Sequence, residues 1–180
     1  MKSFAILFLA FGMLQAQGQE VVLSDFKTVP PAVYGTWLDA QTGKSNLRII
    51  TPGQLEVTPP ATAKGGTCEK DLNLSLGTGS VLELTAVVKP GNLANGVNIL
   101  LEDANGVQAG WSLRISDLQP DKKSVLISAP LQSPDFVTAK GDNSQIDLTR
   151  IVGWHVQGDF TSDDQIHLVF ERLVVRPKSL

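Results

Sequence analysis

Apolar and polar residues alternate along much of this chain, with the two-residue period of a β-strand. Between residues 97 and 115, two apolar runs flank the turn Asp103-Ala104-Asn105-Gly106, and its Asn-Gly pair favours a positive-φ hairpin. Over residues 72–76 every second residue is leucine, as a half-buried strand requires. Gly, Pro and Thr recur too often for a helix of ordinary length. The pattern therefore predicts an all-β domain.

The remaining apolar runs predict further strands at 21–26, 47–50, 54–58, 81–89, 123–128, 151–157 and 166–175. We interpret 30–37 as irregular and 59–66 as a loop because both are rich in Pro, Thr, Ala or Gly, and 129–149 is the longest connection. The last run is apolar on both faces, which is typical of a central strand covered by a second layer. About ten strands with these connections indicate a two-sheet antiparallel β-sandwich.

Residues 1–18 have the pattern of a secretory signal peptide. Lys2 precedes an apolar core from Phe4 to Leu14, and small residues at Ala16 and Gly18 offer cleavage sites. The alternative, a membrane anchor, needs a longer apolar run. We therefore expect one exported domain at residues 19–180, secreted or periplasmic and of bacterial origin, with no membrane insertion.

Charge and cysteine content limit which partners and cross-links we expect for this protein. The formal net charge is −3, and Lys and Arg are scattered, so no nucleic-acid footprint is present. The single Cys68 cannot form an internal disulfide. We expect it to be a small buried hydrophobe, while an exposed or intermolecular thiol remains open.

Catalytic patterns are weak, and we expect no enzyme activity. The only histidines, His155 and His167, lie inside predicted strands, and no spacing marks a zinc site, a nucleophile elbow or a phosphate loop. A pair of carboxylates for glycoside hydrolysis stays open, because Glu56, Glu83 or Glu102 could meet another carboxylate across a sheet.

Four phrases in order resemble a known family. They are Asp25-Phe26, then 102–106 followed by Gly110-Trp111, then 151–158, and finally 166–175. In this order they resemble the galactose-binding-like jelly rolls, a superfamily that includes many carbohydrate-binding modules. The resemblance implies a sandwich of eight to ten strands, often with a structural calcium and often with sugar bound on a concave sheet or at loop tips. It does not by itself imply a ligand, because one fold serves many functions.

The resemblance also implies a possible Ca²⁺ site at Asp25 and Glu171. The family commonly has an aspartate in the last strand, where this chain has Glu171. Glutamate oxygens also ligate calcium, but the longer side chain shifts the carboxylate, and the neighbouring Arg172 is a competing partner. Asp25 could equally be an ordinary residue at the end of a strand.

Sugar recognition needs flat apolar surfaces together with planar polar groups. Trp111 and Trp154 alternate in step with apolar neighbours, so we expect both in the core. Tyr34 and Trp37 lie in a Pro- and Gly-rich stretch, where a binding platform is plausible.

Alternation also predicts a polar patch on the side of the sheet away from these tryptophans. Its members are Asn98, Glu102, Gln108, Ser112, Arg114, His155 and Gln157. The alternative is an ordinary solvated face, and a bulge would reverse any of these assignments.

Two functions follow from this sequence. The first is a non-catalytic carbohydrate-binding protein that recognises a glycan or polysaccharide. The second is a structural or adhesive sandwich that contacts a protein partner outside the cell. An exposed Tyr34/Trp37 pair favours the first, and a buried pair favours the second.

Overall fold

The computed structural model describes residues 19–115, 125–139, 141 and 145–178, so the signal predicted at 1–18 lies outside it. This part of the chain holds twelve strands and one short 3-10 turn, η1 (Leu148–Arg150). The strands are β1 (Val21–Ser24), β2 (Ala32–Gly35), β3 (Leu47–Thr51), β4 (Gln54–Val57), β5 (Gly65–Glu69), β6 (Ser80–Val88), β7 (Gly96–Asp103), β8 (Gln108–Arg114), β9 (Val125–Pro130), β10 (Phe136–Thr138), β11 (Ile151–Gly158) and β12 (Leu168–Pro177).

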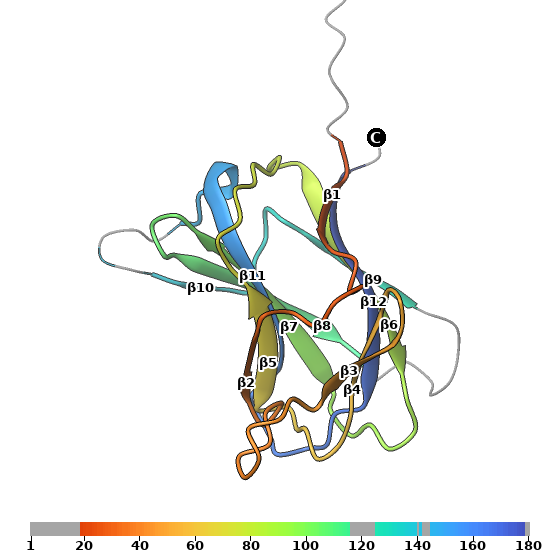
Figure 1. Ribbon diagram of the computed structural model, residues 1–180. Helices are drawn as coiled ribbons and strands as arrows, with labels where there is room; N and C mark the ends of the chain where they lie inside the picture. The colour runs from red at the N-terminus through yellow and green to blue at the C-terminus, as the bar shows by residue number, and fades with distance from the viewer. Residues whose placement is uncertain (1–18, 116–124, 140, 142–144, 179–180) are drawn as a thin grey trace, which may run out of the picture.

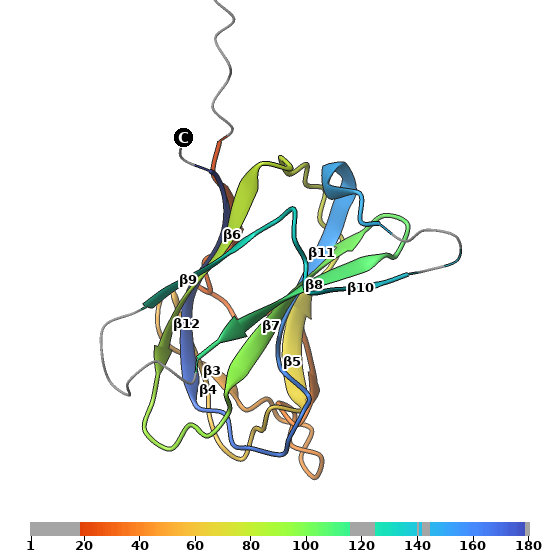
Figure 2. The ribbon, with the colours of Figure 1, turned by 180° about the vertical axis from the view of Figure 1, so that it is seen from behind.

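The strands form two antiparallel sheets that face each other (Figure 1). Sheet A has the order β3-β4-β12-β6-β9, and β1 pairs with the later half of β12. Sheet B has the order β10-β8-β7-β11-β5-β2. The view from behind shows the same two layers, with β12 inside sheet A and β7 and β11 inside sheet B (Figure 2). The all-β sandwich predicted from the sequence is confirmed, with twelve strands rather than about ten.

An aromatic cluster joins the two sheets through the core. The ring centroids of Phe26 and Trp154 on β11 lie 6.1 Å apart, and those of Phe26 and Phe170 on β12 lie 5.9 Å apart. Trp37 stacks on Phe170 from the other side at 6.1 Å. All four side chains are fully buried. Each aromatic side chain of this size buries on the order of 150–250 Å², so this cluster is a large part of the hydrophobic stabilisation.

Most of the predicted strands are confirmed, and the hairpin matches closely. It is formed by β7 and β8, and Gly106 at its turn has φ +78°. Asp103 closes the turn because its Oδ1 accepts hydrogen bonds from the backbone N–H groups of Asn105 and Val107. Trp111 and Trp154 are fully buried, as predicted.

Three strands were missed, and one predicted strand is wrong. β2 lies in the stretch interpreted as irregular, β5 begins at the end of the predicted loop and continues to Glu69, and β10 lies in the long connection. The leucine alternation at 72–76 makes only an isolated bridge, between Leu74 and Ile151, beside the part of β11 that pairs with β5. The side chains still alternate in burial there, but the backbone does not form a ladder.

Two glycines explain why β5 escaped prediction. A Cβ on Gly65 would lie 2.1 Å from Cδ1 of Trp37, and a Cβ on Gly66 would lie 2.6 Å from the Tyr34 ring. The strand therefore needs glycine for close aromatic contact, although glycine weakens intrinsic strand propensity.

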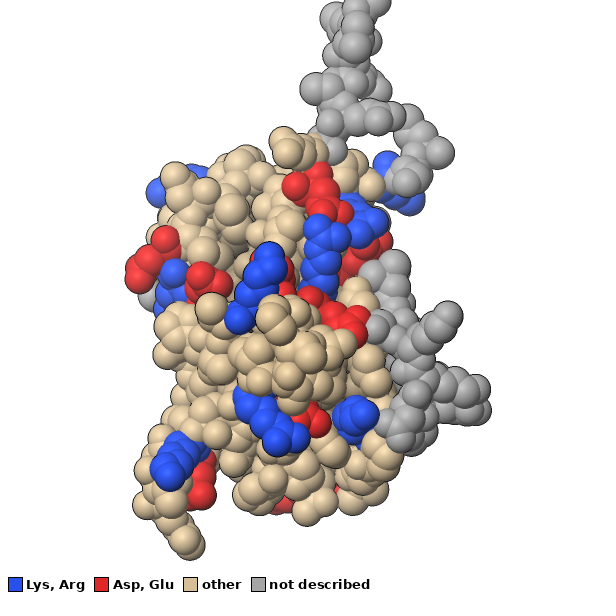
Figure 3. Space-filling view, turned by 45° about the vertical axis from the view of Figure 1, so that its right-hand side comes forward, with Lys and Arg blue, Asp and Glu red and all other residues tan. Residues whose placement is uncertain are grey.

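Charges on sheet A are paired rather than gathered into a patch of one sign. Arg172 and Arg176 on β12 both contact Glu20, and Arg176 also contacts Glu83 on β6 at 3.0 Å. Acidic and basic side chains are correspondingly intermingled on the side of the molecule in Figure 3. Within the described residues, no helix has the length and apolar character needed to cross a membrane.

Gly65→Ala should destabilise the fold. The added Cβ would overlap Trp37 in the core, and such overpacking typically costs about 1–3 kcal/mol of unfolding free energy. Gly79→Ala is the matched control, because a Cβ there meets nothing within 4 Å. Urea unfolding of both variants measures the difference, and equal stabilities would contradict this account of β5.

Candidate functional site

Strand β11 separates the core of the sandwich from the outer face of sheet B. Trp154 and Val156 point into the core and are fully buried, while His155 and Gln157 point outward. In the antiparallel ladders, His155 pairs with Cys68 and Leu100, and Gln157 pairs with Gly66 and Asn98.

The predicted polar residues do share this outer face. Asn98 on β7 lies between Gln157 on β11 and Ser112 on β8, and Glu102 pairs with Gln108. Arg114 ends β8, exposed and opposite Gly96, with no ion pair to any residue that the structure describes. We call the set of outward residues the outer polar strip: Asn98, Glu102, Gln108, Ser112, Arg114, His155 and Gln157.

Tyr34 extends this strip across the edge strand β2. Its hydroxyl donates to Oε1 of Gln157 at 2.8 Å and lies 3.3 Å from Nδ1 of His155. Its ring lies over Gly66, the residue that pairs with it in β5. Burial raises the pKa of Tyr34 well above the usual value for tyrosine, so the phenol stays protonated and keeps its hydrogen bond.

His155 is neutral in this setting. Burial lowers its pKa below the ordinary histidine value, against the opposing influence of the Glu102 carboxylate. Because the Tyr34 hydroxyl donates its proton to Gln157, Nδ1 of His155 is the donor in the contact with Tyr34. Nε2 is buried and has no hydrogen-bond partner among the described residues, since Oε2 of Glu102 is 3.6 Å away.

Glu102 remains ionised although it is largely buried. Burial raises its pKa, but the hydrogen bond from Gln108 at 3.1 Å and the charge of Lys70 at 3.5 Å outweigh this and hold the pKa below the usual range. These contacts all involve Oε2. Oε1 is therefore available to accept a hydrogen bond from a ligand hydroxyl.

Cys68 is on the same face as His155, its cross-strand partner, and its free thiol is buried there, as expected. It pairs with His155 on one side and Ala32 on the other. Burial raises the pKa of its thiol, so it is not an activated nucleophile.

The prediction that Trp37 helps to form a binding platform is wrong. Its side chain is fully buried, and its indole Nε1–H donates to the carbonyl of Thr62 at 3.0 Å. The chain turns inward after β2, so Tyr34 and Trp37 lie on opposite sides of the sheet. The aromatic pair proposed from sequence is therefore separated.

Sequence reasoning missed a second aromatic side chain on this face. Phe136 on the edge strand β10 pairs with Gly110 on β8, and a Cβ on Gly110 would lie 2.1 Å from the tip of the Phe136 ring. The ring therefore lies over Gly110, and 37% of the residue remains exposed. The strand-forming run Phe136-Val137-Thr138 between Pro134 and Gly141 was the available signal.

The residues predicted to bind calcium have other partners. Asp25 forms an ion pair with Lys27 at 2.6 Å, and Oε1 of Glu171 accepts a hydrogen bond from Gln54 at 2.8 Å. Among the described residues, no three His, Cys, Asp or Glu side chains cluster as a metal site requires. Calcium binding stays a prediction.

The three glutamates considered for hydrolysis each face a base. Glu56 contacts Arg48 at 2.6 Å and His167 at 3.1 Å, while Glu83 contacts Arg176. Glu102 contacts Lys70. Among the described contacts, Glu56 and Glu102 have no second carboxylate for acid–base work. Glu83 shares Nε of Arg176 with Glu20, at 3.0 Å and 2.7 Å, so the guanidinium neutralises this pair of carboxylates.

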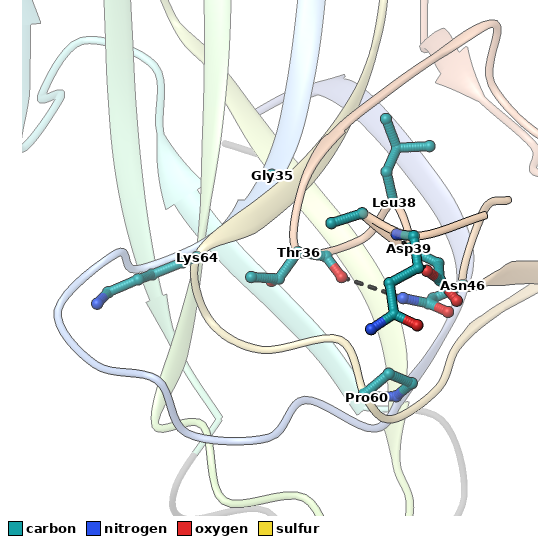
Figure 4. A pocket seen from close by; sticks show the side chains of 9 residues that line it. Gly35, Thr36, Leu38, Asp39, Asn46, Pro60 and Lys64 are labelled. Atoms are coloured by element: carbon teal, nitrogen blue, oxygen red, sulfur yellow. Dashed lines mark hydrogen bonds between the residues drawn. The ribbon is translucent and has the colours of Figure 1, made fainter. Parts of the chain in front are cut away.

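A cavity of about 580 Å³ opens beyond the end of β2, between Thr36, Asp39, Asn46, Pro60 and Lys64. Most of its polar groups, apart from the exposed side chain of Gln41, are already engaged, as Figure 4 shows for the Asn46 amide, which donates to the Thr36 carbonyl. Lys64 extends away from the other side chains and binds Asp163, and Asp39 accepts two backbone hydrogen bonds in its own turn. We therefore take the outer polar strip as the candidate site.

Comparison with solved structures relates the fold to known proteins. A family 11 carbohydrate-binding module from Clostridium thermocellum, in complex with a β-1,3-1,4-mixed-linked tetrasaccharide, is 19% identical over 87% of this chain and 95% of its own, with a TM-score of 0.59. The chain shares the fold of carbohydrate-binding modules. The jelly-roll resemblance seen in the sequence is confirmed at the level of fold.

Two further matches show the range of this fold. A xylan-binding module is 11% identical over 77% of this chain and 88% of its own, with a TM-score of 0.50. An exo-β-agarase is 13% identical over 89% of this chain, with a TM-score of 0.58, but this chain spans only 25% of the agarase. The chain spans 22% and 25% of two other matched chains, the second of them also an agarase. No protein-family model and no curated protein matches the sequence.

The lowered pKa of His155 predicts a pH dependence of stability. The unfolded chain takes up a proton near pH 6.5, whereas folded His155 resists protonation until lower pH. The stability that comes from neutral His155 is therefore present above about pH 6.5 and declines as the pH falls toward the folded pKa.

His155→Gln should remove this component, so the stability difference between wild type and variant should shrink between about pH 7.5 and pH 5. Urea unfolding across this range provides the measurement. A difference that does not change with pH would contradict the assignment.

Proposed function

We propose that this protein is a non-catalytic carbohydrate-binding protein whose site is the outer polar strip together with Tyr34. The observation that carries the proposal is the Tyr34 arrangement. An aromatic ring lies over a glycine of the sheet, and its hydroxyl is fixed by Gln157 and His155. Such a ring offers its outer face to the apolar C–H side of a pyranose.

The neighbouring groups suit sugar hydroxyls. Gln108 and Gln157 carry amides at this face, and the Asn98 amide lies between their strands but is only 9% exposed. Arg114 carries a guanidinium with no ion pair to a described residue, and Oε1 of Glu102 makes no hydrogen bond to a described residue. Amides both donate to and accept from hydroxyls, a guanidinium donates to them, and an ionised carboxylate accepts from them.

The comparisons support the class of ligand. The matched module from Clostridium thermocellum was solved with a mixed-linked β-glucan tetrasaccharide, and another match is described as xylan-binding. We therefore propose a polysaccharide or a longer glycan as the ligand. The signal pattern at residues 1–18 supports export to the periplasm or beyond. The basic partners of Glu56, Glu83 and Glu102 support a role without catalysis.

Binding is tested with purified protein that lacks the predicted signal. The probes are soluble mixed-linked β-1,3-1,4-glucan, xylan and agarose, measured by affinity electrophoresis and calorimetry. Tyr34→Ala should weaken binding to the preferred probe about tenfold or more, because it removes the stacking surface. Gln157→Ala should weaken it less, through loss of the hydroxyl contact that orients the ring.

Gln54→Ala is the matched control for Gln157→Ala. Gln157 makes one described side-chain hydrogen bond, with Tyr34, whereas Gln54 makes two, with Thr51 and Glu171, and lies on sheet A. It should bind like the wild type. A folded wild-type protein that binds none of the probes would contradict the proposal and favour a role in contacts with other proteins.

A further inference from the structure

The two edge strands of sheet B carry the same aromatic arrangement. Tyr34 on β2 pairs with Gly66 and lies over it, and Phe136 on β10 pairs with Gly110 and lies over it. The outer polar strip lies between them on β11, β7 and β8. An aromatic ring placed over a cross-strand glycine covers exposed backbone, and this alone would account for one such pair. Here the pairs flank a row of hydrogen-bonding groups from both sides.

We propose that Phe136 is a second stacking surface for the same ligand, and that the site takes one linear glycan chain that crosses the strands from Tyr34 to Phe136. This inference rests on the proposed function. It adds a residue, a minimum length and a direction for the ligand, and it excludes a site for a single terminal sugar.

The register gives the distance between the two rings. Gly66 and Gly110 are separated by three strand spacings across β5, β11, β7 and β8, which is about 14 Å at ~4.8 Å per spacing. They are also offset by two residues along the strands, since Gly66 shares a row with Asn98 and Gly110 shares one with Leu100. That offset is about 7 Å at right angles to the first distance, so the two glycines under the rings are about 16 Å apart. A disaccharide cannot reach both rings, whereas a longer chain can.

The groups between the rings are polar near Tyr34 and apolar near Phe136. Gln157, His155 and Asn98 follow Tyr34, whereas Leu100 pairs with Gly110 beneath Phe136, and Ser112 lies beside this end. A chain along this line would place hydroxyls over the polar groups and the apolar side of a sugar over Leu100. Its first and last sugars would stack on the rings.

Sheet twist restricts the physical form of the ligand. Adjacent strands rotate by about 20°, so three spacings turn the surface by about 60° between the two rings. A flat, rigid polysaccharide crystal can therefore contact only one ring at a time. A single soluble chain can rotate about its linkages and follow the surface to the second ring.

The test is a ladder of mixed-linked β-1,3-1,4-gluco-oligosaccharides, from disaccharide to hexasaccharide, measured by calorimetry. If the protein does not bind the glucan probe, the corresponding oligosaccharides of xylan or agarose are used instead. Wild-type affinity should rise steeply once the oligosaccharide is long enough to reach both rings. Phe136→Ala should reduce binding of the longest oligosaccharide by about tenfold and leave the disaccharide unchanged.

Two further variants separate binding from folding. Phe160→Ala removes an aromatic side chain that is 44% exposed and lies outside sheet B, and it should bind like the wild type. Phe136→Leu keeps an apolar cover over Gly110 but removes the flat ring, so it should show the same length-dependent loss as Phe136→Ala. A purely structural role for Phe136 would lower thermal stability without any dependence on oligosaccharide length.

The outcomes separate this inference from the proposed function. If Tyr34→Ala loses affinity for all lengths but both Phe136 variants bind every length like the wild type, the second platform is excluded and the carbohydrate site stands. A wild-type affinity that does not increase beyond the disaccharide, or stronger binding to microcrystalline polymer than to soluble chains, would also overturn the inference. If the wild-type protein binds no oligosaccharide of any series, both this inference and the proposed function are overturned.

Discussion

The contact of Phe26 with Trp154 on one side and Phe170 on the other is the interaction on which this sandwich depends. Phe26 belongs to neither sheet, yet it joins β11 of sheet B to β12 of sheet A. Its φ of +49° is a left-handed conformation that few non-glycine residues adopt, and burial of the ring compensates for that cost. The chain turns sharply after β1 to put this ring between the layers.

The same contact determines what the outer face of sheet B presents to solvent. Because successive side chains of a strand point to opposite faces, His155 and Gln157 point outward when Trp154 lies in the core. The register of β11 with β5 and β7 then sets their neighbours, and β2 brings the Tyr34 hydroxyl to them. The core and the candidate site are therefore two sides of one strand, and a slip of one residue would exchange them.

The sequence was sufficient for the features that depend on period and turn chemistry. The hairpin of β7 and β8, the buried Trp111 and the shared face of Asn98 and Gln157 all follow from alternation. Features that depend on contacts between distant glycines and aromatic rings could not be predicted. Gly65 and Gly66 resembled loop residues, and only the fold shows that Trp37 needs one and Tyr34 the other. The role of Phe136 could not be predicted for the same reason, because its partner Gly110 belongs to a separate part of the chain.

The position of β12 at the centre of sheet A has a consequence for the newly made chain. This strand begins at residue 168, yet it pairs with β6, β4 and β1. Until a ribosome has synthesised it, β4 and β6 have no shared neighbour, and the core has no second wall. The domain must therefore fold late, from contacts between distant parts of the chain, and its earlier strands stay open to aggregation in the meantime. Loss of β12 would leave two disconnected pieces of sheet rather than a smaller domain.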